Sequence, residues 1–347
     1  VERVDHRAPS LDCEEPPLVG RGAELAVLHE AWEACRVGEG QVVGVVGAPG
    51  LGKTRIIDEF RSSIGRDVIL GRGEPVRAVV PYLAIRNVLR AALGIPMEAD
   101  GRRAADALRA WVRAEAPQLE RWVAVLGIPI DADLSGVDGR DALDAEAQRE
   151  LLRSTVCAAL EVAILPRTLI ILEDVHWFDD ASRGLLAGLM VAARRSGWLL
   201  VVSSRDRDSI DRPEGSESWW KLVVLEPIDP SAARRLVVAA AGDRALRNDD
   251  IDAISERAAG NPLFLRELAA RSSPTDGAPL PENVERLLAA RLDEIPAAQR
   301  KRLREAAVLG QNAELALLAE ISGDPTVPSG HGLIVVDLAQ EIGRAHV

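Results

Sequence analysis

The chain contains 347 residues, of which 47% are hydrophobic and 28% are charged, and its formal net charge at pH 7 is −12. This length exceeds one typical domain, and the composition is that of a folded protein rather than a disordered one. No apolar run reaches the roughly 18–20 residues that a membrane helix needs, and residues 1–17 lack an apolar signal-peptide core. The acidic charge and the lack of a basic, aromatic-rich cluster argue against direct DNA binding. We expect neither a membrane nor, for this chain alone, DNA as a partner.

Three cysteines, Cys13, Cys35 and Cys157, lie far apart and form no CxxC pair. An odd, scattered set of cysteines is typical of a reducing compartment and argues against a disulfide scaffold or a zinc site. We therefore expect a cytoplasmic location.

Five short apolar segments predict the strands of a sheet, at residues 41–47, 67–70, 168–172, 198–202 and 222–225. Helical patterns separate them, including a long helical stretch over about 81–163. Continuous apolar strands that alternate with helices are typical of a parallel sheet covered on both faces. The predicted fold is therefore α/β.

The pattern changes after Pro227, because only helical periodicity follows between 230 and 322, as at 284–292 and 300–309. We expect an all-α domain to follow the α/β domain, with a boundary near residue 228. The predicted domains are a disordered tail (1–17), the α/β domain (18–228), a helical lid (229–290), the start of a further helical or winged-helix domain (291–325) and a loop with a terminal tail (326–347).

The first predicted strand leads into a complete phosphate-binding loop of the form GxxxxGK[ST]. The loop consists of Gly47, Ala48, Pro49, Gly50, Leu51, Gly52, Lys53 and Thr54. Its glycines let the backbone turn its N–H groups toward phosphate oxygens, at the positive end of the helix that follows. Lys53 would reach the β- and γ-phosphates and Thr54 would bind Mg²⁺, so the fold is predicted to be that of a P-loop NTPase. The alternative is a glycine-rich turn without a ligand.

A second acidic motif follows the third predicted strand, where Glu173 and Asp174 come directly after the apolar residues 168–172. One carboxylate would hold hydrated Mg²⁺ and the other would polarise the attacking water, which leaves their individual roles open. His176 follows at once, and we interpret it as a hydrogen-bonded structural histidine rather than as a metal ligand or base.

The polar residues Ser203, Ser204 and Arg205 end the strand at 198–202. In P-loop folds this strand end faces the γ-phosphate, so Ser203, Ser204 or Arg205 could sense that phosphate, and Arg205 is the candidate catalytic residue. The alternative is a solvated surface arginine. Farther along the chain, Asn261 is placed to cap a helix whose first residue is Pro262.

Four motifs in this order, LVGRGAEL, GAPGLGKT, LEDVHWFDDAS and GNPLFLREL, resemble the signal-transduction ATPases with numerous domains (STAND). More narrowly, they resemble the ATPase module of large ATP-binding LuxR-type transcriptional regulators, which also occurs in some adenylate cyclases and protein kinases. The resemblance covers about residues 18–321. It implies that ATP or ADP binds with Mg²⁺, and that Val19, Gly20, Arg21 and Pro262 contact the nucleotide base. This chain departs from the family in its Glu-Asp pair, and it lacks the superhelical repeats and the C-terminal helix-turn-helix of the regulators.

The leading hypothesis is an ATP-controlled switch with slow ATP turnover, which self-associates on activation and acts on DNA only through a C-terminal domain absent from this chain. One alternative is the regulatory module of a cyclase or kinase, in which case a cyclase domain would normally precede residue 1. The other alternative is a remodelling or loading ATPase. Residues 342–347 match the translation of common sequencing-adapter DNA. We therefore expect residues 341–347 to derive from an adapter at the end of a truncated reading frame.

Overall fold

The computed structural model describes residues 17–65, 68–73, 81–134, 144–242, 244 and 246–271, together with the backbone of 312–314, 335–337 and 344–346. The chain divides into two compact units. The first contains residues 23–48 and 53–225, and the second contains residues 2–22, residues 49–52 and those from 226 onward. The division at Leu225 lies close to the predicted boundary at 228.

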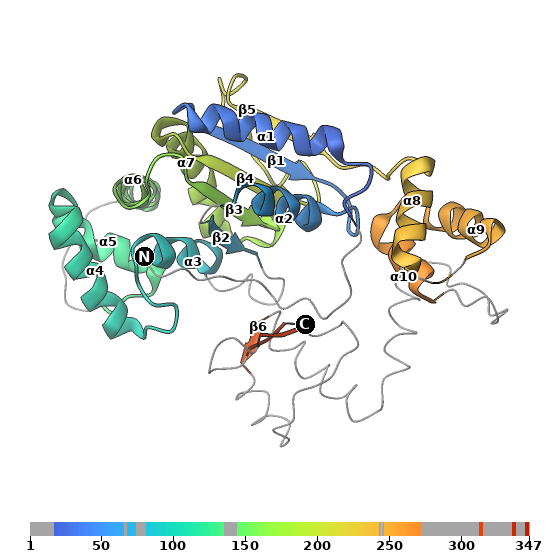
Figure 1. Ribbon diagram of the computed structural model, residues 1–347. Helices are drawn as coiled ribbons and strands as arrows, with labels where there is room; N and C mark the ends of the chain where they lie inside the picture. The colour runs from blue at the N-terminus through green and yellow to red at the C-terminus, as the bar shows by residue number, and fades with distance from the viewer. Residues whose placement is uncertain are drawn as a thin grey trace, which may run out of the picture. The chain divides into compact units, whose positions relative to one another are not determined.

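The first unit is built on a five-stranded, wholly parallel sheet with the order β2-β3-β4-β1-β5 (Figure 1). Its strands are β1 (Gln41–Val46), β2 (Val68–Arg72), β3 (Leu169–Glu173), β4 (Leu199–Ser204) and β5 (Trp220–Val224). Strands β1, β3 and β4 are buried along their whole length, which explains why their sequences consist mainly of Val, Ile and Leu. The predicted α/β fold with a parallel sheet is confirmed, and all five predicted strands are present.

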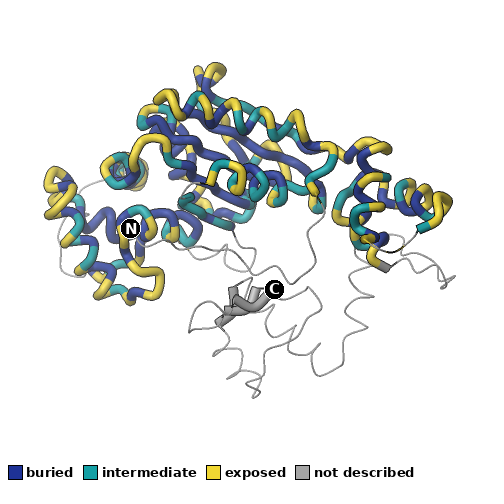
Figure 2. Tube along the Cα trace, in the orientation of Figure 1, coloured by how far each residue is buried: buried dark blue, intermediate teal, exposed yellow. Residues whose placement is uncertain are grey.

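Helices separate the strands as predicted. They are α1 (Gly22–Arg36), α2 (Lys53–Ile64), α3 (Leu83–Ala92), α4 (Gly101–Glu115), the 3-10 helix η2 (Pro117–Trp122), α5 (Val123–Ile130), α6 (Ala145–Ala163), the 3-10 turn η3 (Val175–Trp177) and α7 (Asp180–Ser196). Helix α7 packs on β1 and β4, and α3 packs beside β2. The long helical stretch between β2 and β3 adds its own apolar side chains to one continuous core, drawn dark blue in Figure 2.

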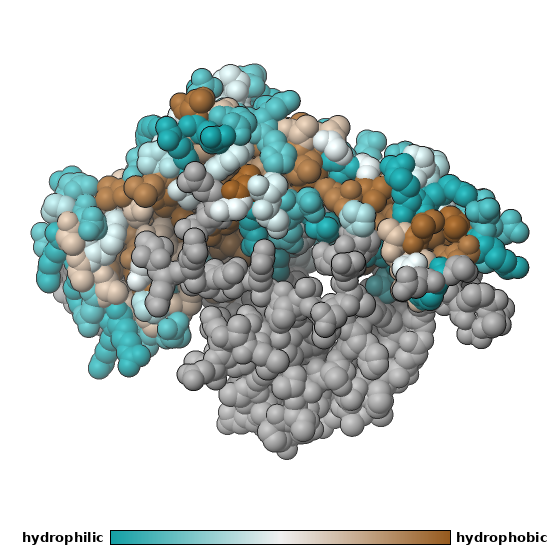
Figure 3. Space-filling model, viewed as in Figure 1, coloured by the Kyte–Doolittle hydropathy of each residue, from teal (hydrophilic) through white to brown (hydrophobic). Residues whose placement is uncertain are grey.

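Carboxylates begin several of these helices. The side chains of Asp100, Asp144 and Asp179 accept hydrogen bonds from backbone N–H groups in the first turns of α4, α6 and α7. Each cap satisfies a donor that the helix itself leaves unpaired. Charged residues then occupy the outer face of α4, which is largely hydrophilic in Figure 3.

The second unit contains three helices, α8 (Pro230–Ala241), α9 (Asn248–Ala258) and α10 (Pro262–Arg271). Their apolar faces form a separate core that includes Ile228, Leu236 and Phe264, and Val19 packs against it from the segment before α1. Gly20 has φ +71°, and a Cβ there would lie 2.7 Å from the Cβ of Ala232, so only glycine fits this close approach. The predicted helical character after residue 228 is confirmed for the helices up to Arg271.

Three short strands were not expected from the sequence. Strands β6 (Asn312–Glu314), β8 (Arg344–His346) and β7 (Val335–Asp337) form an antiparallel sheet in that order. The sequence shows only helical patterns around the first strand, within the predicted helical or winged-helix domain, and it predicts a loop over 326–347. The strands at 335–337 and 344–346 differ from that loop. Three-residue strands are held by backbone pairing and are too short to carry a hydrophobic period.

Other predictions lie outside the described residues. These are the disordered tail, apart from Pro17, and the helical patterns at 284–292 and 300–309. Within the described part of the chain, no helix has both the length and the apolar character to cross a membrane.

Candidate functional site

Lys53 is the first residue of α2 and lies at the carboxyl end of β1 in the first unit. Its Nζ donates to the carbonyl of Gly47 at 2.7 Å and to that of Ala48 at 3.3 Å. Burial lowers the pKa of the Lys53 ammonium, Asp174 raises it, and Arg205 lowers it further. Asp174 and Arg205, two of the other predicted site residues, are thus charged neighbours of Lys53 in the first unit. Thr54 follows in the first turn of α2 and is exposed.

The tip of the phosphate loop, residues 49–52, belongs to the second unit. The Nδ2 of Asn261 donates to Pro49 O at 3.1 Å, and the backbone N–H of Leu263 donates to Gly50 O at 3.2 Å. Gly50 and Gly52 have φ values of +81° and +90°, which only glycine adopts without strain. The sequence prediction that these glycines serve the curvature of the loop agrees with this backbone.

Arg21 is 5% exposed, and its Nη2 donates to Leu51 O at 3.2 Å and to Glu226 O at 2.6 Å. It thus ties the loop tip to the start of the helical segment. Val19 and Gly20, which precede it, lie against the core of the second unit. The resemblance assigns these three residues to base binding, and the structure places all three in the second unit, with the Nη2 of Arg21 held by main-chain carbonyls.

Pro262 is the first residue of α10, and Asn261 caps that helix through its Oδ1, which accepts from Leu263 N at 3.1 Å and Phe264 N at 3.3 Å. The predicted helix start is confirmed. The same asparagine uses its amide nitrogen on the loop, a role that the sequence did not predict.

Glu173 is the last residue of β3 and lies opposite Arg72, the last residue of β2. The Arg72 Nε donates to Glu173 Oε2 at 2.8 Å, and its Nη2 donates to the same oxygen. The Glu173 side chain is 4% exposed. Its carboxylate is therefore buried and already paired with a cation.

Asp174 differs from Glu173 in each of these respects. It has φ 53° in the left-handed region, its side chain is 31% exposed, and its backbone N–H donates to the Ser203 hydroxyl at 3.0 Å. The backbone turn at this residue directs the two neighbouring carboxylates to different surroundings. Asp174 is the carboxylate that raises the pKa of Lys53. The hydrogen bonds from Arg72 go to Glu173.

Arg205 directly follows β4, and its guanidinium carbon lies 5.2 Å from the centre of the Trp177 ring. Cation–π contact of this kind orients an exposed arginine. Arg205 is exposed, so the alternative of a solvated surface arginine stays open beside the predicted sensor role.

His176 is 8% exposed in its side chain, and among the described residues neither ring nitrogen has a hydrogen-bond partner. The interpretation of His176 as a hydrogen-bonded histidine is therefore wrong. The ring instead packs on Trp177 with ring centres 5.0 Å apart, and its Nδ1 lies 4.0 Å from Asp174 Oδ1. Burial lowers the pKa of His176, although Asp174 opposes this shift.

The candidate site offers few protein ligands for a metal ion, so Mg²⁺ would bind there together with a nucleotide. The described residues contain no cluster of three or more His, Cys, Asp or Glu side chains suited to a metal ion. Mg²⁺ is ordinarily bound by one or two carboxylates together with phosphate oxygens and water, so such a cluster is not required. The exposed Thr54 hydroxyl and the partly exposed Asp174 carboxylate are donors of the right kind.

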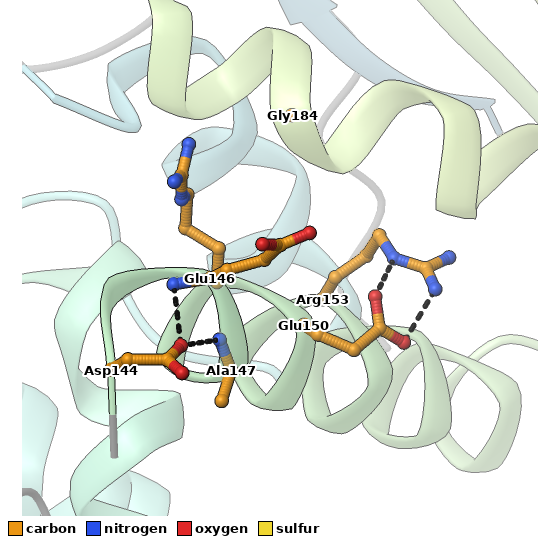
Figure 4. A pocket seen from close by; sticks show the side chains of 7 residues that line it. Asp144, Glu146, Ala147, Glu150, Arg153 and Gly184 are labelled. Atoms are coloured by element: carbon orange, nitrogen blue, oxygen red, sulfur yellow. Dashed lines mark hydrogen bonds and ion pairs between the residues drawn. The ribbon is translucent and has the colours of Figure 1, made fainter.

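A cavity of about 770 Å³ elsewhere in the first unit contains none of the predicted site residues (Figure 4). It is lined by α6, the residue before it and one residue of α7, namely Asp144, Glu146, Ala147, Arg149, Glu150, Arg153 and Gly184. Asp144 is used in capping α6, and Glu150 pairs with Arg153. The Nε of Arg149 donates to the backbone carbonyl of Ala145. Most of the charged lining residues are thus engaged in α6 itself.

Sequence reasoning missed Arg72 and the contacts of Asn261 and Leu263 with the loop. Arg72 and Glu173 end neighbouring strands, β2 and β3. Their pairing can be predicted only when the strand order is known. An asparagine before Pro262 is already explained by helix capping, so the sequence gives no reason to expect the contact of Asn261 with Pro49.

The family model for the AAA ATPase domain matches residues 17–202. An uncharacterized protein of Rhizobium meliloti (strain 1021) is 27% identical over 341 residues, which cover 89% of this chain and 31% of that protein. A STAND protein with a tetratricopeptide repeat sensor from Pyrococcus horikoshii has a TM-score of 0.53 at 14% identity, with coverage of 97% of this chain and 43% of that one. A RuvB variant of Thermotoga maritima has a TM-score of 0.44 at 15% identity over 96% of each chain. The chain thus spans less than half the length of the first two.

Proposed function

Because this chain belongs to the family of AAA ATPase domains, we propose that it is an ATP-binding switch module that hydrolyses ATP slowly. The observation that carries this proposal is the place of Lys53, which begins α2 after a loop whose Gly50 and Gly52 have positive φ and which follows β1. Asp174 and Arg205 are charged neighbours of this lysine. A cation next to a loop of turned-in N–H groups suits polyphosphate.

Each residue has a role in this proposal. Lys53 would exchange the carbonyls of Gly47 and Ala48 for the β- and γ-phosphates, and the loop N–H groups would donate to the same phosphates. Thr54 and Asp174 would hold Mg²⁺, which when bound would neutralise phosphate charge. Arg205, oriented by Trp177, approaches the γ-phosphate.

We assign different roles to the two carboxylates. Asp174 is the carboxylate for Mg²⁺ and for the attacking water, because it is the more exposed one and interacts with Lys53. Glu173 positions the end of β3 through its pair with Arg72. Its Oε2 already accepts hydrogen bonds from the Arg72 guanidinium.

The switch part of the proposal rests on the second unit. Val19, Gly20, Arg21 and Pro262, which by resemblance contact the base, all belong to the unit that also contains the loop tip. ATP and ADP would then favour different positions of that unit by as much as their affinities for those positions differ. Activation would proceed through self-association of the ATP-bound form.

The larger protein is proposed to be a LuxR-type transcriptional regulator in the cytoplasm, with DNA binding in a C-terminal domain beyond this chain. The STAND structure, of which this chain covers 43%, supports a module within a longer protein. A regulatory module of an adenylate cyclase or kinase is the alternative, and a stand-alone remodelling ATPase is a further one.

The test is to measure Mg²⁺-ATP binding by calorimetry and ATP turnover in the same sample. The switch proposal expects near-stoichiometric binding with turnover slow enough that most protein stays occupied. Fast multiple turnover would favour a remodelling ATPase, and no binding at all would reject the nucleotide site. The 347-residue chain should also give no sequence-selective gel shift with DNA.

A further inference from the structure

Three consecutive carbonyls of the phosphate loop accept hydrogen bonds from the second unit. Asn261 Nδ2 donates to Pro49 O, Leu263 N to Gly50 O, and Arg21 Nη2 to Leu51 O, over distances of 3.1 to 3.2 Å. All of these residues belong to one unit. We call this set of three contacts the loop clasp.

The clasp determines where the loop points its donors. A trans peptide is planar, so the carbonyl of one residue and the N–H of the next point in opposite directions. Holding the carbonyls of Pro49, Gly50 and Leu51 therefore orients the N–H groups of Gly50, Leu51 and Gly52. These are the donors that a phosphate-binding loop offers to its ligand.

Gly50 shows how closely the clasp fits. A Cβ at this position would lie 2.7 Å from Asn261 Oδ1, 3.0 Å from Asn261 Nδ2 and 3.1 Å from Leu263 Cβ. Gly50 is therefore needed for two reasons: it adopts the positive φ of the loop, and it leaves room for Asn261 and Leu263 at the start of α10.

Asparagine suits both ends of this contact. Its Oδ1 accepts from the first turn of α10, and its Nδ2 donates to the loop. Serine or aspartate would cap the helix as well, but neither supplies an amide donor.

We propose that Asn261 and Arg21 are positioning residues for the phosphate loop, which set its N–H groups in place before nucleotide binds. This inference rests on the proposed nucleotide site. It differs from a base contact, because a positioned loop strengthens the binding of phosphates and leaves the binding of the nucleoside unchanged.

The test uses Asn261→Ser, which keeps a capping hydroxyl, adds no charge and removes the donor to Pro49. Losing one neutral hydrogen bond costs about 1 kcal/mol, so we expect about fivefold weaker binding of ATP and of ADP. Competition by adenosine at millimolar concentration should not change. Asn248→Ser is the matched control, since Asn248 lies in the first turn of α9 in the same unit and has no described bond to the loop.

A second measurement needs no nucleotide. Amide hydrogen exchange in the peptide that covers residues 48–54 should be faster in Asn261→Ser than in wild type and unchanged in Asn248→Ser. A thermal midpoint for each variant identifies any general loss of folding. The proposal would be rejected if a folded Asn261→Ser variant had the ATP affinity and the amide exchange of the wild type. It would also be rejected if the variant lost adenosine binding by the same factor as ATP binding. If the wild type itself binds no ATP, the proposed function fails, while the exchange measurement still decides whether the clasp orders the loop.

Discussion

Arg72 and Glu173 face each other at the ends of neighbouring strands, with two nitrogens of the guanidinium on a single carboxylate oxygen. The glutamate side chain is 4% exposed and the arginine side chain 38%, so solvent reaches the pair only from the arginine. The next residue, Asp174, turns through a left-handed conformation and leaves this environment. Two adjacent carboxylates thus acquire different chemistry from one backbone turn.

Glu173→Gln should lower stability more than activity. The substitution leaves Arg72 partly buried without its counter-ion, and the cost should be about 1–3 kcal/mol, less than for a fully buried pair because water reaches the arginine. Chemical denaturation would measure the loss. Nucleotide affinity measured well below the midpoint should stay within about threefold of wild type, and a large loss of ATP binding without destabilisation would contradict the assigned role.

Asp174→Asn should have the opposite profile. Folding should be nearly unchanged, because the side chain is partly exposed and its backbone contact with Ser203 remains. ATP turnover should fall by about a hundredfold or more, since the carboxylate proposed for Mg²⁺ and for the attacking water is lost. A Mg²⁺ titration of ATP turnover in wild type and in Asp174→Asn would measure the change. Normal turnover in the variant would contradict the role of Asp174 and point to Glu173 as the catalytic carboxylate.

Lys53→Ala should abolish ATP binding or weaken it by about a hundredfold or more, because charged hydrogen bonds of this kind contribute about 1.5–3 kcal/mol each. Calorimetric titration with ATP measures the effect. Lys221→Ala is the control, since Lys221 is a lysine of the same unit whose Nζ pairs with Glu30. Unchanged affinity in Lys53→Ala would reject the phosphate-loop interpretation.

Pro262→Ala should keep α10 but weaken ATP binding by about three- to tenfold. Asn261 still caps the helix, so the thermal midpoint should change little. Affinity and midpoint measured together separate two interpretations. A lower midpoint with unchanged affinity would leave Pro262 as a helix start without a nucleotide contact.

The thiols of Cys35 and Cys157 should be inert in the folded protein. Burial is the largest effect on each group, and it raises the pKa of both thiols to about 11. At pH 8 only roughly one thiol in a thousand is then ionised, and the thiolate is the reactive form. In a Cys13→Ser variant, a thiol reagent at pH 8 should react slowly until denaturant is added, and rapid labelling would show that the burial is wrong.

The sheet could be predicted because its three central strands are buried along their whole length and therefore have largely apolar sequences. The phosphate loop and the Glu-Asp pair could be predicted because their spacing carries the chemistry. Arg72 could not, since its partner depends on which strands are neighbours, and strand order has no signature in the local sequence. The contact of Asn261 with Pro49 joins residues 212 positions apart, and a helix cap alone accounts for an asparagine before Pro262.

Residues 49–51, whose carbonyls accept the bonds of the clasp, belong to the same unit as helices α8, α9 and α10. In the proposed function, a phosphate ligand and the helices of that unit therefore act on the same peptides. Linkage is reciprocal. Any partner or downstream segment that breaks the contacts of the clasp would weaken nucleotide binding by the same factor by which bound nucleotide strengthens those contacts. Nucleotide release and opening of the clasp would then be two measurements of one equilibrium.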